Sequence, residues 1–168
     1  VEYHATATDW YDNPWDVTDG TTFSTSGSGS NTSGGGSTSG GIFVSQHMFV
    51  GTIAGTYFIQ AAYKGVNATT TVTIRHNSPV SLDIDPDEAT TIAGSKMDYH
   101  ATATDIYGNN WAVTADTAFN SDDPWGTMTG EVYTAGMVGT WTVTSVHAGM
   151  TATTTVVVVH GTAAILTI

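Results

Sequence analysis

An all-β protein of two similar domains is the fold that the sequence predicts, and three observations lead to it. The segment Tyr3–Asp9 recurs letter for letter as Tyr99–Asp105, which indicates an internal repeat. Within each copy, apolar and polar residues alternate with a period of two, as they do along a strand with one buried face. Short turn signals such as Lys64-Gly65 and Ala148-Gly149 lie between the alternating runs.

Composition limits the classes of function. Three Lys and Arg against fifteen Asp and Glu give a net charge of −12, which would repel phosphate backbones, so we expect no nucleic-acid partner. The longest aliphatic run, Val156–Val159, is too short to cross a bilayer, so we expect no membrane insertion. Charged residues make up only 11% while Thr, Ser, Gly and Ala are abundant, which suits strands with a hydroxyl-rich outer face and indicates an extracellular, cell-surface location.

The repeat defines the elements in chain order. In the strand Tyr3–Thr8, Tyr and Ala share one face while His and Thr share the other. A turn at Tyr11–Pro14 leads to a strand that carries Trp15, and the copy ends in a hairpin whose last strand is Ala68–Ile74. Seven or so short strands in roughly 90 residues, with a Trp on the third strand of a complete domain, are typical of an immunoglobulin-type β-sandwich.

The two copies differ in length within one tract. Their offset is 96 residues at Tyr3 and 84 residues at Gly55, and the difference of 12 lies in Ser24–Gly41. This tract is almost entirely Ser, Thr and Gly and lacks the Gly-Lys-Ser/Thr of a phosphate-binding loop, so we predict an exposed loop. Asn31 within the tract, and Asn67 after it, match the acceptor pattern for N-linked glycosylation.

The repeated segments also resemble a known family. AGSKMDYHATATDIYGNNWAVT, followed after a variable middle by VYTAGMVGTWTVTSVHAGMTATTTVVV, is similar to the bacterial immunoglobulin-like (Big) repeats of bacterial and archaeal surface proteins. The resemblance covers nearly all of both copies and implies tandem sandwich domains displayed in adhesins, surface layers or filaments. It implies no catalytic residues, and the sequence contains no nucleophile elbow or zinc-hydrolase motif, so we expect no enzyme activity.

The chain is out of phase with its own repeat by one strand. Asn77–Ile84 supplies the first strand of the second copy, and an equivalent segment, Gly161–Ile168, follows that copy, whereas the first copy starts at its second strand. This phase gives a first domain over 1–76 that lacks its first strand, a second domain over 77–160, and a donor strand over 161–168. We therefore expect the first domain to have an open sheet edge.

The C-terminal segment is predicted to fill that edge in another molecule. Gly161 and Thr162 reach only roughly 7 Å when extended, so return to the first domain of the same chain is out of reach if the domains lie end to end. Donation from copy to copy predicts a head-to-tail polymer, an extracellular filament or surface array. The donor residues are Ala163, Ala164, Ile165, Leu166, Thr167 and Ile168.

Two alternatives remain open at this point. The 168 residues form a window of a longer array, in which the last strand closes a covalently linked neighbour. Alternatively, the chain is an immunoglobulin-like segment of a cell-surface adhesin that binds glycan or protein, with aromatic residues such as Trp10 and Tyr11 at its surface.

Acidic residues suggest one optional ion. Asp83, Asp85 and Asp87 lie at the junction of the two domains, and Asp105 lies on a turn of the second domain. Oxygen-rich clusters of this kind bind Ca²⁺ between tandem sandwiches, although no EF-hand spacing is present. Apart from Ca²⁺, the sequence predicts no cofactor.

Val157 and Val159 form a candidate lateral contact between protomers. The alternation of the last strand of the second copy turns both side chains outward, where the first copy has Thr73 and Arg75. An exposed valine pair on one copy alone favours a contact surface.

Overall fold

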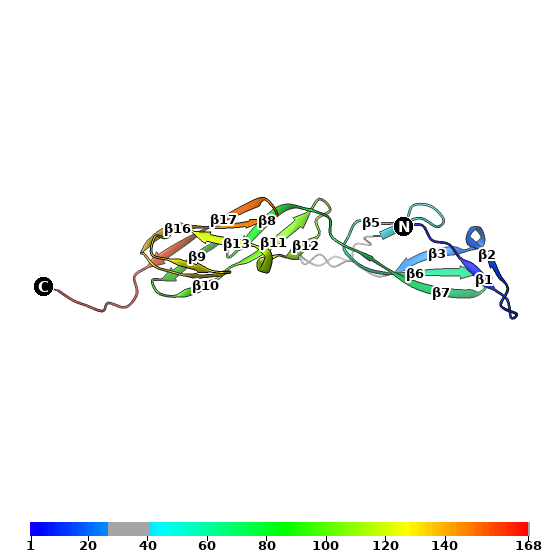
Figure 1. The fold of residues 1–168 in the computed structure, drawn as a ribbon, viewed down its shortest axis with the longest axis horizontal. Helices are drawn as coiled ribbons and strands as arrows, with labels where there is room; N and C mark the ends of the chain where they lie inside the picture. Colours follow the sequence, from blue (N-terminus) through cyan, green and yellow to red (C-terminus); the bar gives the residue numbers. More distant parts are fainter. Residues whose placement is uncertain (27–40, 168) are drawn as a thin grey trace. The chain divides into compact units, whose positions relative to one another are not determined.

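The computed structural model describes residues 1–26 and 41–167, and every regular element among them is a β-strand apart from two single 3-10 turns (Figure 1). The chain forms two compact units. The first comprises Val1–Asn77 with Tyr107–Asn109, and the second comprises Ser78–Ile106 and the residues from Asn110 to the C-terminus. No helix in the described part of the chain is long and apolar enough to span a membrane.

The first unit is built from short strands in three small sheets, with sheet orders β1-β2, β3-β6-β7 and β4-β5. All of its strand pairs are antiparallel, and the β6–β7 hairpin is the longest, running from Gly55↔Ile74 to Tyr63↔Val66. Lys64 and Gly65 close this hairpin with positive φ angles of 47° and 83°. The elements are β1 (Thr6–Thr8), β2 (Pro14–Asp16), η1 (Thr18–Gly20), β3 (Thr22–Ser26), β4 (Gly41–Phe43), β5 (Phe49–Gly51), β6 (Gly55–Tyr63) and β7 (Val66–Ile74).

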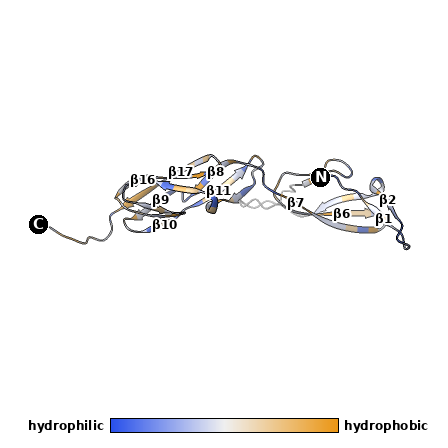
Figure 2. Ribbon diagram, viewed as in Figure 1, coloured by the Kyte–Doolittle hydropathy of each residue, from blue (hydrophilic) through white to orange (hydrophobic). Residues whose placement is uncertain are grey.

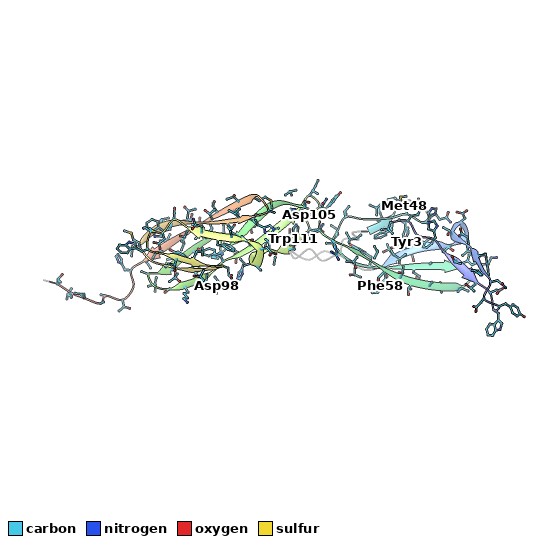
Figure 3. The ribbon with its side chains drawn as sticks, in the orientation of Figure 1. Tyr3, Met48, Phe58, Asp98, Asp105 and Trp111 are labelled. Carbon is cyan, nitrogen blue, oxygen red and sulfur yellow. The ribbon has the colours of Figure 1, made fainter. Side chains whose placement is uncertain are left out.

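Aromatic rings fill the core of the first unit. Phe49, Tyr57 and Ile59 are each 1% exposed, and half-buried neighbours that include Tyr3 (labelled in Figure 3) and Phe43 pack against them. The ring centroids of Phe43 and Phe49, and of Phe49 and Tyr57, lie 5.7 Å apart, within the range of favourable aromatic pairs. The period-two alternation of β6 places Tyr57 and Ile59 on this inner face.

The second unit contains the equivalents of these strands and, at its start, three more, β8, β9 and β10. Its sheet orders are β12-β11-β8, β13-β16-β17-β9 and β10-β15-β14. The elements are β8 (Pro79–Asp85), β9 (Glu88–Ile92), β10 (Lys96–Asp98), β11 (His100–Asp105), β12 (Asn110–Ala112), η2 (Thr114–Asp116), β13 (Ala118–Ser121), β14 (Thr127–Thr129), β15 (Val132–Thr134), β16 (Gly139–His147) and β17 (Met150–Val159).

The opening segment of the second unit belongs to two sheets. β8 pairs antiparallel with β11, and after a bend at Pro86 the chain continues as β9, which pairs parallel with β17. Between these sheets lies a core in which Ile84, Tyr99, Val143 and Val156 are each 3% exposed or less. Figure 2 shows hydrophobic residues on β17 and β8, which contribute to this core. Both units are thus immunoglobulin-like β-sandwiches in an all-β chain.

One buried carboxylate holds a loop of the second unit in place. Asp123, 5% exposed, accepts hydrogen bonds from the Tyr133 hydroxyl at 2.6 Å and from the backbone N–H groups of Gly136, Met137 and Trp125 at 2.8, 3.1 and 3.0 Å. Burial acts to raise the pKa of Asp123, but these hydrogen bonds outweigh it and lower the pKa to about 2. Burial and the neighbouring carboxylate raise the pKa of Tyr133.

Candidate functional site

The two units differ most at one sheet edge, where β1 and β11 are equivalent strands. β11 pairs with β12 on one side and with β8 on the other. β1 pairs with β2 in the same register that β11 keeps with β12, and in the described part of the chain it has no strand on its other side. The first unit therefore has an open edge at the place that β8 occupies in the second.

The backbone hydrogen bonds of β1 show which of its N–H and C=O groups face the open edge. Val17 donates its N–H to the Ala5 carbonyl at 2.9 Å, and Asp9 donates to the Asn13 carbonyl at 3.2 Å, so odd-numbered residues bond towards the β2 side. Because successive residues of a strand direct their N–H and C=O groups to opposite edges, those of Thr6 and Thr8 point to the open edge. An incoming antiparallel strand would find donors and acceptors in ladder order there.

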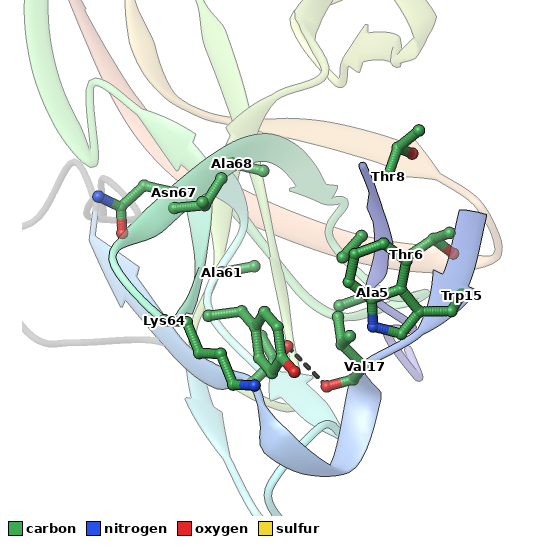
Figure 4. A pocket seen from close by; sticks show the side chains of 13 residues that line it. Ala5, Thr6, Thr8, Trp15, Val17, Ala61, Lys64, Asn67 and Ala68 are labelled. Atoms are coloured by element: carbon green, nitrogen blue, oxygen red, sulfur yellow. Dashed lines mark hydrogen bonds between the residues drawn. The ribbon is translucent and has the colours of Figure 1, made fainter. Parts of the chain in front are cut away.

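Behind the open edge lies an apolar cavity of about 250 Å³ (Figure 4). The β1 side of this cavity is formed by Ala5 to Thr8, and the β7 side by Val66, Asn67 and Ala68. Val17 and Ala61 contribute to its wall, and the Thr21 hydroxyl donates to the Val17 carbonyl at 2.8 Å. We call this the first cavity.

A second cavity, of about 230 Å³, continues the groove along the same two strands. It shares Ala5, Ala61 and Ala68 with the first cavity and reaches Tyr3 and Ile59. Together the two cavities form a groove between β1 and the first half of β7, which we call the acceptor groove.

The exposure of its walls agrees with a groove that no strand of the described residues covers. Ala101 and Ala103 of β11 are 1% and 0% exposed, whereas the equivalent Ala5 and Ala7 are only half-buried. On the other wall, Thr154 of β17 is 4% exposed, whereas the equivalent Thr70 of β7 is exposed. Because these residues are identical in the two units, the difference arises from the missing neighbour and not from the side chains.

The second half of β7 is open as well. In the second unit, β9 pairs with β17 from Thr155↔Glu88 to Val159↔Ile92, and Val156 and Val158 are 0% and 1% exposed. In the first unit, β7 pairs with β6 alone among the described residues, and its Val72 and Ile74 are half-buried.

The predicted donor segment is accessible. Residues 160–167 extend from the second unit without forming a strand (Figure 1), and Ile165 and Leu166 are 83% and 91% exposed. Ala163, Ala164 and Thr167 are exposed too, and Ile168 lies outside the described residues. The donor assignment of this segment remains a prediction.

The donor segment corresponds to β8 position by position. With the offset of 84 residues, Leu166 corresponds to Leu82, Thr167 to Asp83 and Ile168 to Ile84. In β8, Leu82 and Ile84 face the core and Asp83 faces outward. Unlike β8, residues 161–168 carry no charged side chain, and most of the residues that line the two cavities are likewise uncharged, Lys64 being charged.

The predicted calcium ligands do not gather in the structure. Asp85 is paired with His100 at one end of the β8–β11 ladder, and Asp105 is paired with Pro79 at the other end. Asp83 and Asp87 are exposed, whereas Asp105 is 3% exposed. In the ranges 1–26 and 41–167, no three acidic or metal-binding side chains are close enough to hold an ion. Sequence proximity at the junction is therefore not matched by spatial proximity.

Val157 and Val159 lie on β17 with 37% and 39% exposure, so both are accessible for a lateral contact. Val157 also lines a shallow cavity beside Glu88–Thr90 of β9. The lateral contact itself remains a prediction.

Of the two candidate glycosylation sites, Asn67 lies within the described residues. Asn67 is exposed on β7 and lines the first cavity, as Figure 4 shows. Asn31 lies outside the described residues. Modification of either residue remains a prediction.

The known proteins to which this chain is similar are solved structures. No family model and no curated relative matches the chain. Among solved structures, domains 1–6 of surface layer protein SbsC are similar over 94% of this chain and 23% of that chain, with 19% identity and a TM-score of 0.43. Domains 4 and 5 of the same protein are similar over 92% of this chain and 79% of theirs, with 18% identity and a TM-score of 0.42. A chimeric titin Z1Z2 tandem matches over 65% of both chains with 14% identity and a TM-score of 0.30. This chain spans about a quarter of the first of these surface-layer structures.

Sequence reasoning missed β9. The period-two run Glu88–Ile92 is only five residues long and follows a Pro and two acidic residues, so it resembles a loop in sequence. Its parallel pairing with β17 depends on residues more than 60 positions away, which no local pattern reveals. The alternation of Ala89 and Thr91, which pair with Val156 and Val158, was the available signal.

Proposed function

We propose that the protein is a structural subunit of an extracellular filament or cell-surface array, and that its subunits join by strand donation. The C-terminal segment Ala163–Ile168 of one copy fills the acceptor groove of the first unit of the next. One observation carries the proposal: in the second unit of this same chain, a homologous strand, β8, lies in the equivalent groove.

Strand donation gives the contact a polarity. Donor and acceptor are different surfaces of the chain, so the contact is heterologous, and a heterologous contact produces an open polymer unless the rotation between copies closes a ring. Each copy donates once and accepts once. The expected assembly is therefore a filament or a row of copies of this chain.

Two physical terms favour donation. The donor would bury Leu166 and Ile168, and full burial of one such side chain contributes about 1.5–3 kcal/mol. It would also satisfy the backbone groups of Thr6 and Thr8 at the open edge, and each such hydrogen bond contributes about 0.5–1.5 kcal/mol net. Ordering of the extended segment opposes both terms.

Deletion of Ala163–Ile168 tests the proposal. The full chain is expected to form oligomers and filaments, seen by multi-angle light scattering and negative-stain electron microscopy, and the deleted chain is expected to remain a monomer. Filaments of unchanged geometry from the deleted chain would refute the proposal.

Two other outcomes identify the alternatives. A full chain that stays monomeric, with a tail resistant to carboxypeptidase, would indicate insertion within one molecule. A native protein with an intact mass far above 17.5 kDa would indicate that the neighbouring domain is covalently linked.

A second function, glycan binding by an adhesin segment, is favoured by one loop. Trp10 and Tyr11 are 95% and 84% exposed. The loop that carries them is held by Asp9, whose carboxylate accepts from the backbone N–H of Tyr11 at 2.8 Å and of Asn13 at 3.0 Å. Exposed aromatic faces suit stacking on sugar rings. Loss of glycan-array binding in Trp10→Ala, with filaments intact, would support this function, and an array without signal for the unmodified chain would remove it.

A further inference from the structure

The second unit shows more than the presence of a groove, because it shows how a strand lies in one. Resting on the proposed function, we infer the register of the donor: Thr167 of one copy pairs with Thr6 of the next, which places Leu166 opposite Ala7 and Ile168 opposite Ala5. The strand runs antiparallel to β1.

The register follows from the β8–β11 ladder. There, Leu82 is paired with Ala103, Asp83 with Thr102 and Ile84 with Ala101. Replacing each β11 residue by its equivalent 96 positions earlier, and each β8 residue by its equivalent 84 positions later, gives the inferred pairs. In this alignment each residue of β1 has a donor partner, whereas Ala164, the equivalent of Val80 at the register shift of the β8–β11 ladder, has none.

Leu166 then fills the first cavity. In the second unit, Leu82 packs against Ala101, Ala103 and Val113, with Trp111 beside them. The equivalents of these four residues, Ala5, Ala7, Val17 and Trp15, all line the first cavity. The first cavity is thus the space that Leu82 occupies in the other unit.

Ile168 fills the second cavity by the same comparison. Ile84 is 3% exposed and belongs to a core cluster with Tyr99 and Val143. Their equivalents, Tyr3 and Ile59, line the second cavity. The two cavities follow one another along β1, and Leu166 and Ile168 are two positions apart on one face of the donor. Each of these side chains therefore meets one cavity.

Other registers lose these contacts. A slip of one residue would turn Leu166 and Ile168 outward and put Ile165 and Thr167 into the groove. A slip of two residues in one direction would place Leu166 opposite Ala5 and Ile168 opposite Tyr3, leaving Ala164 in the first cavity. A slip in the other direction would place Ile168 opposite Ala7 and empty the second cavity.

Engineered disulfides test the register without disturbing the core, because Thr6 and Thr167 both lie on the outward face. The chain contains no cysteine, so in a double variant Thr6→Cys, Thr167→Cys only the two introduced thiols can form disulfides. Directly opposite residues in an antiparallel ladder lie within disulfide reach, and diagonal neighbours lie beyond it. On mild oxidation this variant is expected to give a ladder of covalent multimers on a non-reducing denaturing gel.

Matched variants provide the controls. Asp83→Cys, Thr102→Cys places the equivalent pair within one unit and is expected to close an intrachain disulfide with the mass of a monomer. Thr8→Cys, Thr167→Cys and His4→Cys, Thr167→Cys represent the two slips and are expected to form multimers at least tenfold more slowly.

The outcomes separate the register from the proposed function. A ladder from a slipped pair, with little from the inferred pair, would refute the register and leave strand donation intact. Filaments in microscopy with no ladder from any pair would refute donation by this segment. A disulfide that forms only within a monomer would keep the register and refute donation between copies.

A substitution gives an independent readout. Leu166→Ala is expected to weaken assembly by roughly tenfold to a hundredfold, because it empties the first cavity. Thr167→Ala, on the outward face, is expected to change assembly less than threefold. Equal effects of the two substitutions would refute the inference that Leu166 faces the groove and Thr167 faces outward.

Discussion

At the scale of single residues, small side chains make the groove. Ala5 and Ala7 leave room above β1 because they carry only a methyl group, and in the second unit the same Ala pair lies beneath Leu82 and Ile84 with 1% and 0% exposure. The HATATD segment of the second unit thus has a packing reason, because β11 lies beneath the bulky side chains of β8, and the proposed function extends this reason to the first unit.

Ala7→Leu is expected to prevent acceptance, because the added side chain occupies the first cavity and overpacking of a filled site is destabilising. Sedimentation should show assembly weakened at least roughly tenfold. Thr6→Leu, one position away on the outward face, serves as the control. Full assembly by Ala7→Leu would contradict the location of the acceptor.

Asp123 makes the stability of the second unit depend on pH. Its pKa falls from 3.8 in the unfolded chain to about 2 in the folded unit, so the carboxylate stabilises the fold fully above about pH 4. This contribution, about 2 kcal/mol, is lost as the pH falls through about 2. Asp123→Asn should therefore lower the free energy of unfolding at pH 7 and flatten its pH dependence between pH 4 and 2, measured by urea unfolding. Asp116→Asn, on an exposed residue, should do neither.

At the scale of elements, the same strands have different numbers of neighbours in the two units. β11 and β17 are paired on both sides, whereas β1 and β7 are each paired on one side in the described part of the chain. Backbone amides of a strand that is paired on one side exchange through local opening events of lower free energy than those of a strand that is paired on both sides. The backbone amides of β1 are therefore expected to be less protected from exchange than those of β11, and those of β7 less than those of β17.

Hydrogen exchange measured by mass spectrometry tests this on the chain without Ala163–Ile168. Peptides from β1 and the first half of β7 should exchange faster than those from β11 and β17. Addition of the synthetic peptide Gly161–Ile168 should slow exchange in β1 and β7 alone, and a scrambled peptide of the same composition should not. Protection elsewhere, or none, would contradict the acceptor groove.

At the scale of the whole molecule, the proposed donor and the proposed acceptor are separate segments of the chain, so each can be removed independently. The chain without its tail keeps the groove, and Ala7→Leu keeps the tail. Mixing the two should give a 1:1 heterodimer and nothing larger, as measured by light scattering. Higher oligomers in the mixture, or no association, would exclude a head-to-tail contact.

Much of the architecture could be predicted from local patterns. The duplicated HATATD segment predicted two domains, period-two alternation located most of the strands, and the likeness of Ala163–Ile168 to Pro79–Ile84 led to the prediction that the tail is a donor strand. These features are readable because a repeat and a strand face are properties of adjacent residues.

The tertiary structure alone decided which edges are open and what lies behind them. Strand neighbours are far apart in sequence, so the parallel pairing of β9 with β17, the two cavities between β1 and β7 and the bonds of Asp123 could not be read locally. For the same reason the sequence did not reveal that Asp85 and Asp105, two of the predicted calcium ligands, come to opposite ends of one antiparallel ladder. The sequence by itself determined the two sandwiches and the likeness of the tail to β8, and only the packing of distant strands determined which strand edges are unpaired among the described residues.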